Sequence, residues 1–375
     1  MAQFLDLHRK CFITSGKNPS HGRLSTVGFR VFNPLSLFLA GEQGAWYDPS
    51  DITTLFQDSA GTTPMSAVGT VADQPVGLMR DKSGRGNHAF QATAGNRPML
   101  SARVNLLLAT ATLSTQSVTS LATNYTLSFT GTGTVTLSGT ATGVLSAGSN
   151  TFTATAGTLT LTVSGSVTLA DLRPTNSGAL LPPYQRVNTA SDYDTVGFPL
   201  YLKANGTSSA MSTNSINFTA TDKMTLVVGV RKLSDATTAT FIELSANYDS
   251  NPNTFVAYIT TTERFGINAR LGTYPSGVGV SSGYIAPISV VYTAIADIAL
   301  PIRKLRLLGA DVATSSASIG AGNFGNYPLY LLSRAGTSLF LNGQFYGAII
   351  RGAQSDNSSV IQTEQYMAQK TGISF

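Results

Sequence analysis

The stretch TFTATAGTLTLTVSGSVTL, residues 151–169, alternates apolar side chains with small hydroxylated ones. Side chains two positions apart share one face of a β-strand, so this pattern gives a strand one apolar face and one face of methyl and hydroxyl groups. The same pattern occurs upstream in YTLSFT (125–130) and TVTLSG (134–139), where Thr and Val are β-branched residues that favour the pleated state. The sequence therefore predicts a β-sheet unit in this part of the chain.

This β-rich stretch carries no charged side chain between Arg103 and Asp171. Exposed strand edges with low charge tend to pair with other chains, and charged residues are what usually prevents such pairing. We therefore expect the edges of this unit to be covered by a partner chain or by the rest of the protein. We therefore expect the protein to be part of a multi-subunit assembly.

The composition is that of a globular β protein. The chain has 375 residues with 36 Gly, 15 Pro and 11% charged residues, which is long enough for two or three compact units with full cores. Its net charge of +5 is spread over small clusters such as Arg9-Lys10 and Arg80-Asp81-Lys82. No aromatic residues are interleaved with these clusters, so they indicate solvated surface and the sequence predicts no nucleic-acid binding.

The one cysteine, Cys11, excludes an intramolecular disulfide framework and fits synthesis in a reducing cytoplasm. No run approaches the roughly 18 apolar residues that a membrane-spanning helix needs. The N-terminus also lacks the basic, apolar and small-residue progression of a secretory signal. We expect a protein that is neither inserted in a membrane nor exported by a signal, and that leaves cells by a route such as lysis.

The chain divides into three parts by composition. Residues 1–40 mix Gly, Pro and His with short apolar pieces, which indicates an irregular attachment arm. Residues 41–103 and 175–375 form the larger unit, and residues 104–174 are a module inserted between its two halves. Within the arm, Phe29, Val31 and Phe32 could dock on another subunit or pack on their own domain.

Strand patterns recur about every ten residues after Leu200, the spacing of an all-β sandwich. KMTLVVGVRK (223–232) and PISVVYTAIA (287–296) are examples. The closing segment DNSSVIQTEQYMAQKTGI instead shows helical spacing, with Asp356 or Ser358 as the N-cap and Gly372 as the stop. The sequence predicts an antiparallel sandwich with one short C-terminal helix.

Several segments resemble a recurrent family of bacteriophage and prophage virion proteins. They are GAWYDPSD (44–51), LFQDSAGTTP (55–64), DKSGRGNHAFQATAGNRP (81–98), LPPYQRVNTASDYDTVGFPLYL (181–202) and FLNGQFYGAIIRGAQSDNSSVIQTEQYMAQKTG (340–372). This resemblance implies a laminin-G or concanavalin A-like jelly-roll β-sandwich. The uncharged module is similar to carbohydrate-binding-like β insertions of phage tail proteins, which implies a second, small inserted β-sandwich.

The chain departs from these relatives at one turn that could hold a metal. Ala204-Asn205-Gly206 stands where an Asp-rich turn is common, and Ca²⁺ needs six to eight oxygen ligands. We therefore expect an ordinary hairpin there and no metal or other cofactor. The acidic pairs Asp48/Asp51 and Asp192/Asp194 are interpreted as turn formers because Asp side chains bond to the backbone two residues on.

The carboxylates argue against an enzyme. A glycosidase needs two acids about 5 to 10 Å apart, which strand alternation would supply as acids two positions apart. The glutamates Glu42, Glu243, Glu263 and Glu364 have no second acid at that spacing. Cys11 has His8 three residues away, but we interpret this thiol as structural because the segment reads as an arm. No catalytic residue is predicted.

A glycan-binding site asks for less, since sugars are held by aromatic faces and by amide and carboxylate contacts. The candidate ligand-binding residues are aromatic side chains beside Gly, Pro or Asp: Trp46, Tyr47, Tyr184, Tyr193, Tyr248, Tyr274 and Tyr284. Trp46 could instead be a core anchor, and the tyrosines could form a subunit interface.

The leading hypothesis is a non-enzymatic virion structural protein, a tail or fibre component that is oligomeric, with a trimer favoured. Its partners would be other virion proteins and a host-surface glycan. An architectural tail-tip or capsid decoration protein that binds only virion proteins is the alternative. A polysaccharide depolymerase that uses Glu243 or Glu263 is a further one.

Overall fold

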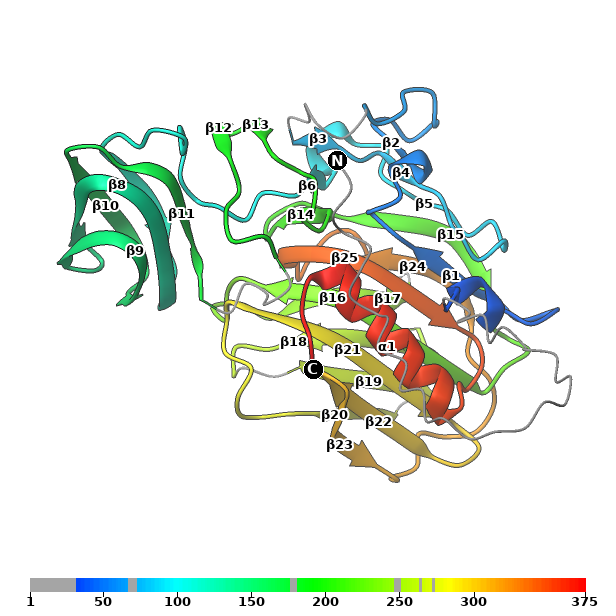
Figure 1. Ribbon diagram of the computed structural model, residues 1–375. Coiled ribbons are helices and arrows are strands. Elements are labelled where there is room, and N and C mark those ends of the chain that lie inside the picture. The colour runs from blue at the N-terminus through cyan, green and yellow to red at the C-terminus, as the bar shows by residue number, and fades with distance from the viewer. Residues whose placement is uncertain (1–31, 67–72, 176–180, 246–250, 263–264, 272–273) are drawn as a thin grey trace, which may run out of the picture. The chain divides into compact units, whose positions relative to one another are not determined.

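The computed structural model describes residues 32–375 except 67–72, 176–180, 246–250, 263–264 and 272–273. Within these residues, two antiparallel sheets of nine strands each form the larger unit (Figure 1). The all-β sandwich predicted from the sequence is confirmed.

Sheet A contains the long central strands of the sandwich. Its order is β23 (Ala310–Ser315), β22 (Ile302–Leu307), β21 (Ile288–Asp297), β16 (Lys223–Lys232), β25 (Asn342–Arg351), β14 (Tyr201–Asn205), β6 (Met99–Ser101) and β3 (Gln74–Pro75), and β1 (Gly44–Tyr47) also pairs with β25. Strand β25 therefore pairs with β16 along one edge, and with β14 and then β1 along the other. Residues 44–47 are thereby fixed in a sheet whose other strands come mainly from the second half of the chain.

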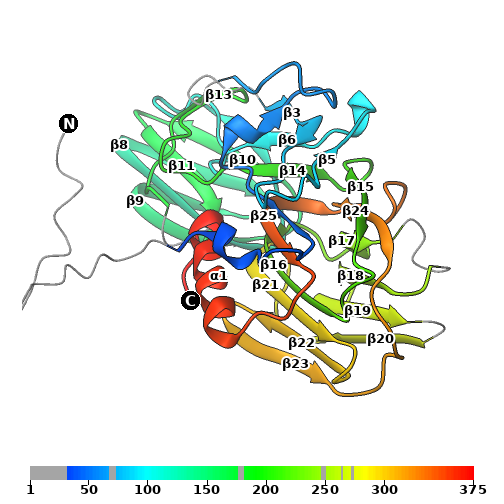
Figure 2. The same cartoon turned by 90° about the vertical axis from the view of Figure 1, so that its right-hand side faces the viewer.

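Sheet B forms the other layer, which Figure 2 shows beside sheet A. Its order is β2 (Leu55–Phe56), β4 (Leu78–Met79), β5 (Ala89–Phe90), β15 (Met211–Asn217), β24 (Asn326–Leu331), β17 (Ala239–Leu244), β18 (Thr254–Ile259), β19 (Phe265–Leu271) and β20 (Tyr274–Gly279). The chain passes between the sheets several times after β14. Sheet B thereby joins the early strands β2, β4 and β5 to strands that begin at Met211 or later.

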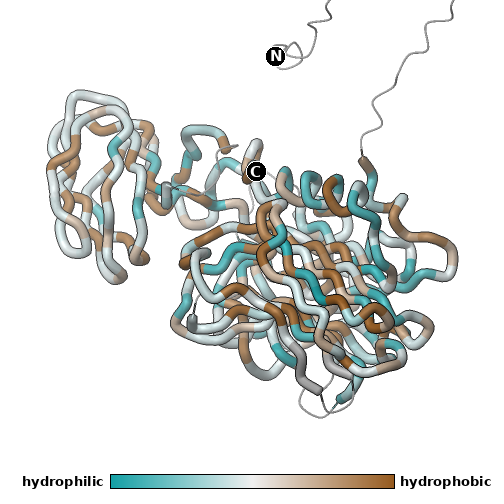
Figure 3. Tube along the Cα trace, turned by 90° about the horizontal axis from the view of Figure 1, so that it is seen from below, coloured by the Kyte–Doolittle hydropathy of each residue, from teal (hydrophilic) through white to brown (hydrophobic). Residues whose placement is uncertain are grey.

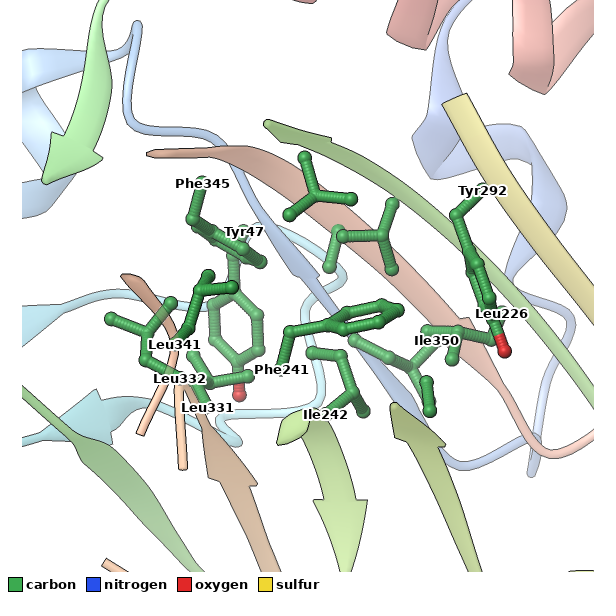
Figure 4. Packing of buried hydrophobic residues seen from close by; sticks show 14 of the residues in the cluster. Tyr47, Leu226, Phe241, Ile242, Tyr292, Leu331, Leu332, Leu341, Phe345 and Ile350 are labelled. Atoms are coloured by element: carbon green, nitrogen blue, oxygen red, sulfur yellow. The ribbon is translucent and has the colours of Figure 1, made fainter. Parts of the chain in front are cut away.

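The core lies between the inner faces of the two sheets. Figure 4 shows Tyr47 and Phe345 from sheet A packed with Phe241 and Leu331 from sheet B. The rings of Phe241 and Tyr292 meet edge to face at 4.9 Å. Each large apolar side chain buried in this way contributes about 1.5–3 kcal/mol, so the sandwich has ample burial to hold its outer loops.

The uncharged module folds around a core of its own. Its strands are β7 (Gln116–Ser120), β8 (Thr123–Gly139), β9 (Gly143–Ala154), β10 (Gly157–Ser164) and β11 (Thr168–Pro174), in the order β11-β8-β10-β7 with β9 on β8. Leu127, Val135 and Leu159 are among its fully buried residues. Hydroxyl groups pair across its outer surface, and Figure 3 draws much of this unit in pale shades because Thr, Ser and Gly have intermediate hydropathy.

Two buried amide side chains hold the chain where it enters and leaves the module. Asn105 Nδ2 donates to the carbonyl oxygens of Ala170 (2.9 Å) and Gln185 (3.0 Å), while its Oδ1 accepts from the N–H groups of Leu107 and Leu172. Gln185 Oε1 accepts from the N–H groups of residues 104 and 105, and its Nε2 donates to the carbonyls of residues 102 and 194. Both side chains are fully buried, so their hydrogen bonds replace water for eight backbone groups.

Short elements complete the structure. They are the strands β12 (Val187–Thr189) and β13 (Asp192–Tyr193), which pair with each other, and the 3₁₀ turns η1 (Pro34–Leu37), η2 (Ile52–Thr54) and η3 (Ala94–Asn96). Phe32 and Leu37 pack in a cluster on the outer face of sheet A. Residues 32–40, the last part of the predicted arm, thus contact the sandwich.

Helix α1 (Asn357–Thr371) lies across the outer face of sheet A (Figure 1). Asp356 caps its N-terminus by accepting from the N–H of Ser359, and Gly372 ends it in the left-handed conformation. The predicted helix is therefore confirmed, with Asp356 rather than Ser358 as the cap. Its Met367 and Ala368 pack on Trp46, Val227 and Ile349 of the sheet.

Strands β20 and β23 were not predicted from the sequence. Strand β20 contains Pro275 and two glycines, and β23 reads ADVATS with little apolar character. Both lie at the edge of their sheets, where a strand needs neither a continuous hydrogen-bond ladder nor a strongly apolar face.

We expect Asn105→Ala to destabilise the protein by about 2–4 kcal/mol, because it leaves four buried backbone groups without their hydrogen bonds. Urea unfolding followed by circular dichroism measures this loss. Asn188→Ala is the matched control, since the exposed Asn188 side chain bonds to Asp192 alone among the described residues and its loss should cost less than about 0.5 kcal/mol. Equal costs for the two variants would contradict the role assigned to Asn105.

Candidate functional site: the outer face of sheet B

Three of the predicted ligand-binding aromatics are buried, so Gly, Pro or Asp neighbours did not indicate a ring at the surface. Trp46 lies on β1 beneath α1 and is 7% exposed. Tyr47 is fully buried between the sheets, and its hydroxyl donates to the carbonyl of Asn87. Tyr193 is 2% exposed and contacts Ser101 through its hydroxyl. The local sequence around Trp46 did not reveal that a helix from the far end of the chain covers β1.

Two others are half-buried and belong to different places. Tyr184 bonds through its hydroxyl to Thr110 near the module junction. Tyr284 packs its ring edge to face against Phe265, at 6.3 Å. The structure does not bring these two rings together with the three buried ones into a common binding surface.

The remaining predicted residues are described only in part. Tyr274 begins strand β20, opposite Leu271, and Tyr248 lies outside the described residues. Of the predicted attachment residues, Phe29 and Val31 also lie outside them. Phe32 packs on its own domain, with its ring 6.2 Å from that of Tyr366, as the alternative interpretation held.

The acidic pairs take part in turns and ion pairs. Asp48 accepts from the N–H of Ser50 and is paired with Lys82 (3.1 Å) and Lys370 (3.0 Å). Asp192 and Asp194 both pair with Arg186. Asn205 Oδ1 accepts from three successive backbone N–H groups, those of residues 207, 208 and 209, which is an ordinary turn arrangement.

Burial alone would raise the pKa of Asp48. The hydrogen bond from Ser50 and the charges of Lys370 and Lys82 outweigh burial and hold this pKa below its usual value. The charged form of Asp48 is therefore the form that the folded protein stabilises.

One row of side chains crosses all nine strands of sheet B on the face turned away from sheet A. Within each strand, the row residue alternates with residues that point into the sandwich core. Row residues of neighbouring strands are direct partners in the strand register. The row runs Phe56, Leu78, Phe90, Ser212, Tyr330, Glu243, Val256, Asn268 and Gly277.

The row changes character along its length. At the β2 end, Phe56 and Leu78 are almost completely buried and Arg80 stands over the Phe56 ring at 4.5 Å. At the other end, Tyr330 and Asn268 are half-exposed and Gly277 is exposed. The accessible residues at this end are therefore Tyr330, Asn268 and Gly277 on β24, β19 and β20, while Glu243 and Val256 between them are fully buried.

Tyr258 lies over strands β19 and β20 at this end of the row. A Cβ atom added at Gly266 would stand 2.4 Å from Tyr258 Cζ, and one added at Gly277 would stand 3.2 Å from its Oη. The ring therefore covers the backbone of β19 and β20 in space that only glycine leaves free. Because Tyr258 is half-exposed, this leaves part of the ring open to solvent.

A charged pair lies between the two tyrosines. Glu243 is fully buried, and its Oε2 is 3.7 Å from Nε of Arg334, whose side chain is 25% exposed. Burial, and after it the negative charge of Glu243, raise the pKa of the Tyr330 phenol. The phenol thus stays protonated at neutral pH and can donate a hydrogen bond.

The face offers the groups that bind polyhydroxylated molecules. Two tyrosine rings supply C–H stacking surfaces, and the Asn268 amide and Arg334 guanidinium supply polar contacts. The nine-residue row itself contains one carboxylate, Glu243, whereas glycoside hydrolysis requires two. This arrangement suits binding.

Two hollows lie elsewhere on the molecule. One of about 290 Å³ is bordered by residues 109–112 and 186–188, near the module junction. The other, of about 330 Å³, lies beside Ser50, Pro199 and Lys370. Neither contains a residue of the sheet B row.

In the part of the chain that the structure describes, no group of three or more His, Cys, Asp or Glu side chains could hold a metal ion. A helix long and apolar enough to cross a membrane is likewise absent from these residues.

Comparison with protein-family models and with curated proteins gave no match. Among solved structures, similar chains include the CBM40 module of the Ruminococcus gnavus IT-sialidase bound to α2,3-sialyllactose, at 15% identity, 41% of this chain, 97% of that chain and a TM-score of 0.33. The botulinum neurotoxin serotype G binding domain is 12% identical, the match covers 47% of this chain and 44% of that one, and the TM-score is 0.36. The leech intramolecular trans-sialidase is 15% identical, the match covers 41% of this chain and 24% of that one, and the TM-score is 0.32. At these TM-scores, the similarities carry no assignment of ligand or activity.

The sequence did not identify Tyr258, Tyr330 or Asn268 as candidate site residues. Each lies inside a strand, whereas the predicted aromatic residues have Gly, Pro or Asp neighbours that are typical of turns. Only Glu243 was named, as a possible acid of a depolymerase. The alternation in TFVAYIT and RFGINARLG does place Tyr258 and Asn268 on the polar face of their strands, and that is the signal that could have found them.

We expect Gly266→Ala to push the Tyr258 ring off the sheet and to destabilise the protein by about 1–3 kcal/mol, because the new methyl group would overlap the ring. Thermal unfolding measures the cost, and a crystal structure of the variant measures the ring position. Gly95→Ala is the control, since a Cβ at Gly95 meets nothing within 4 Å. An unmoved Tyr258 ring in the Gly266 variant would refute the described packing.

We expect Asp48→Asn to cost about 3 kcal/mol at neutral pH, because it leaves two lysines beside an uncharged amide. The folded pKa of Asp48 is lowered, so its contribution is present above the unfolded pKa of about 3.9 and is lost as the pH falls below that value. Unfolding of wild type and variant from pH 7 to pH 2 measures the convergence of their stabilities. The more exposed Asp51→Asn should cost less than about 1 kcal/mol.

Proposed function

We propose that this chain is a non-enzymatic glycan-binding protein whose sugar lies on the outer face of sheet B. The observation that carries the proposal is the Tyr258 ring, which is held over glycine backbone of β19 and β20 near Asn268, on the same face of the sheet as Tyr330. A flat, partly exposed ring fixed in this way is prepared to stack on the C–H face of a pyranose, and little rotamer entropy is lost on binding.

We further propose that the protein is a tail or fibre component of a bacteriophage particle and adheres to the host surface. The support is the similarity of segments 44–51, 81–98, 181–202 and 340–372 to virion proteins. Repeated copies on a particle would raise the avidity of a weak sugar site, because each further contact becomes intramolecular. An oligomer, with a trimer favoured, fits this use.

An architectural protein that binds only other virion proteins is the second candidate, and one observation favours it. Strand β9 extends over 12 residues and is mostly exposed, and its one partner among the described strands is β8. A long, uncharged edge of this kind is suited to pairing with another chain. Such a protein would reach the particle but would not bind sugar.

We expect the isolated wild-type protein to bind host-surface polysaccharide, and Tyr258→Ala and Tyr330→Ala each to weaken binding about tenfold through loss of a stacking surface. Glycan-array screening followed by calorimetry measures this. Tyr184→Ala is the matched control, a half-buried tyrosine away from the row, and should bind as wild type does.

The outcomes separate the candidates. An adhesin binds host cells as isolated protein and loses binding in the two sheet B variants only. A scaffold binds no glycan on the array and no host cells. Release of reducing sugar ends from the polysaccharide would instead favour a depolymerase and would contradict the proposal of a non-enzymatic protein.

A further inference from the structure

The hollow of about 330 Å³ lies beside the C-terminal end of helix α1. The residues around it include Ser50, Leu181, Pro199, Leu200 and Lys370. All nine lining residues fall within three segments, 44–51, 181–202 and 340–372, each of which resembles virion proteins. These segments are far apart in the sequence and meet at the hollow, and none of them contributes a residue to the sheet B row.

Lys370 provides the polar end of this hollow. Its ammonium group donates to Asp48 Oδ2 (3.0 Å) and Ser50 Oγ (2.6 Å) and stands 5.3 Å from the centre of the Tyr366 ring. An ammonium group has three N–H donors, so among the described residues one donor of Lys370 has no hydrogen-bond partner. The side chain is 27% exposed, which leaves this donor accessible.

Lys370 shares its carboxylate partner with a second lysine. Its ion-pair partner among the described residues is Asp48, which also pairs with Lys82, and Lys82 takes Asp51 as a second partner at 2.8 Å. The Asp48 carboxylate is saturated, because it also accepts from Ser50 and Tyr366. An anionic acceptor in the hollow would therefore meet Lys370 without competing with an unsatisfied carboxylate.

The opposite wall of the hollow is apolar. Leu181 and Pro199 are half-buried, and Leu200 is 8% exposed. The one aromatic residue of the lining, Phe198, is 7% exposed and offers little ring surface. Aliphatic walls without an open aromatic face favour an alkyl group over a sugar.

We propose that this hollow binds a carboxylate carried on an aliphatic group, with the carboxylate at Lys370 and the alkyl group against Leu181 and Pro199. Gln369, whose exposed amide also borders the hollow, can donate a second hydrogen bond to the carboxylate. The same chemistry occurs in a free short-chain carboxylate and in the C-terminus of a chain that ends in an aliphatic residue.

An NMR titration of the full chain with sodium hexanoate tests the proposal, with the methyl signals of Leu181 and Leu200 as reporters. We expect saturable shifts of these two residues in the wild type. Lys370→Met should weaken binding about tenfold, the factor that loss of one charge-assisted hydrogen bond gives.

Lys82→Met is the matched control. Lys82 bonds to the same Asp48 oxygen at 3.1 Å and stands 4.4 Å from the Trp46 ring, but it does not border the hollow. Both variants remove a cation from Asp48, so both report the cost of that loss to stability. Only the Lys370 variant should lose hexanoate, and Lys82→Met should bind within about twofold of wild type.

Parallel titrations identify the source of the ligand. A tripeptide that ends in leucine with a free carboxylate should bind more tightly than hexanoate if a chain terminus is the ligand, and its C-terminal amide should not bind. Tighter binding of hexanoate would indicate a free carboxylate. Three results would overturn the proposal: no saturable shift with either acid, equal binding by Lys370→Met, or binding of hexanol as tight as that of hexanoate.

Discussion

The carboxylate of Asp48 joins the two ends of the described chain, and much of sheet A's outer face depends on it. Asp48 follows strand β1 directly, and its Oδ2 accepts from Lys82, Tyr366 and Lys370. Tyr366 and Lys370 lie on α1, more than 300 positions after Asp48 in the sequence. Because the carboxylate is nearly inaccessible to water, loss of one partner would leave a buried charge, so the contacts hold as a group. The helix in turn buries Trp46, and its end forms one side of the hollow at Lys370.

A single extra residue in strand β17 decides what the outer face of sheet B displays. The register to β18 shifts between Thr240 and Ile242, so Phe241 is inserted as a bulge. Both Phe241 and Ile242 then point into the core, and the alternation resumes one step out of phase. Without the bulge, Glu243 would share the face of Phe241 and point inward. The bulge therefore places Thr240 and Glu243 together on the outer face, beside Tyr258 and Tyr330.

The sequence predicted strand positions well where alternation and length were strong. KMTLVVGVRK coincides with β16, and the helix was predicted with both of its end signals. The sequence could not predict which faces of the strands other elements cover. Trp46 and Tyr47 are successive residues on opposite faces of β1, and both are buried, because sheet B covers one face and α1 the other. The row on sheet B depends on registers between strands up to about 120 residues apart, and local patterns do not encode registers of that range.

Charge is used differently in the two parts of the described chain. The sandwich holds distant segments with ion pairs, such as Arg351 with Glu42 and Arg306 with Glu364. The module carries no charged residue before its last strand, β11, where Asp171 and Arg173 pair with each other as the chain leaves it. Asp171 also accepts from the N–H of Gln185, so this ion pair joins the amide network of Asn105 and Gln185. Charged residues are therefore absent from the start of the module and return where the chain leaves it for the sandwich. The module itself packs by apolar and hydroxyl contacts, whereas its junction depends on directed hydrogen bonds.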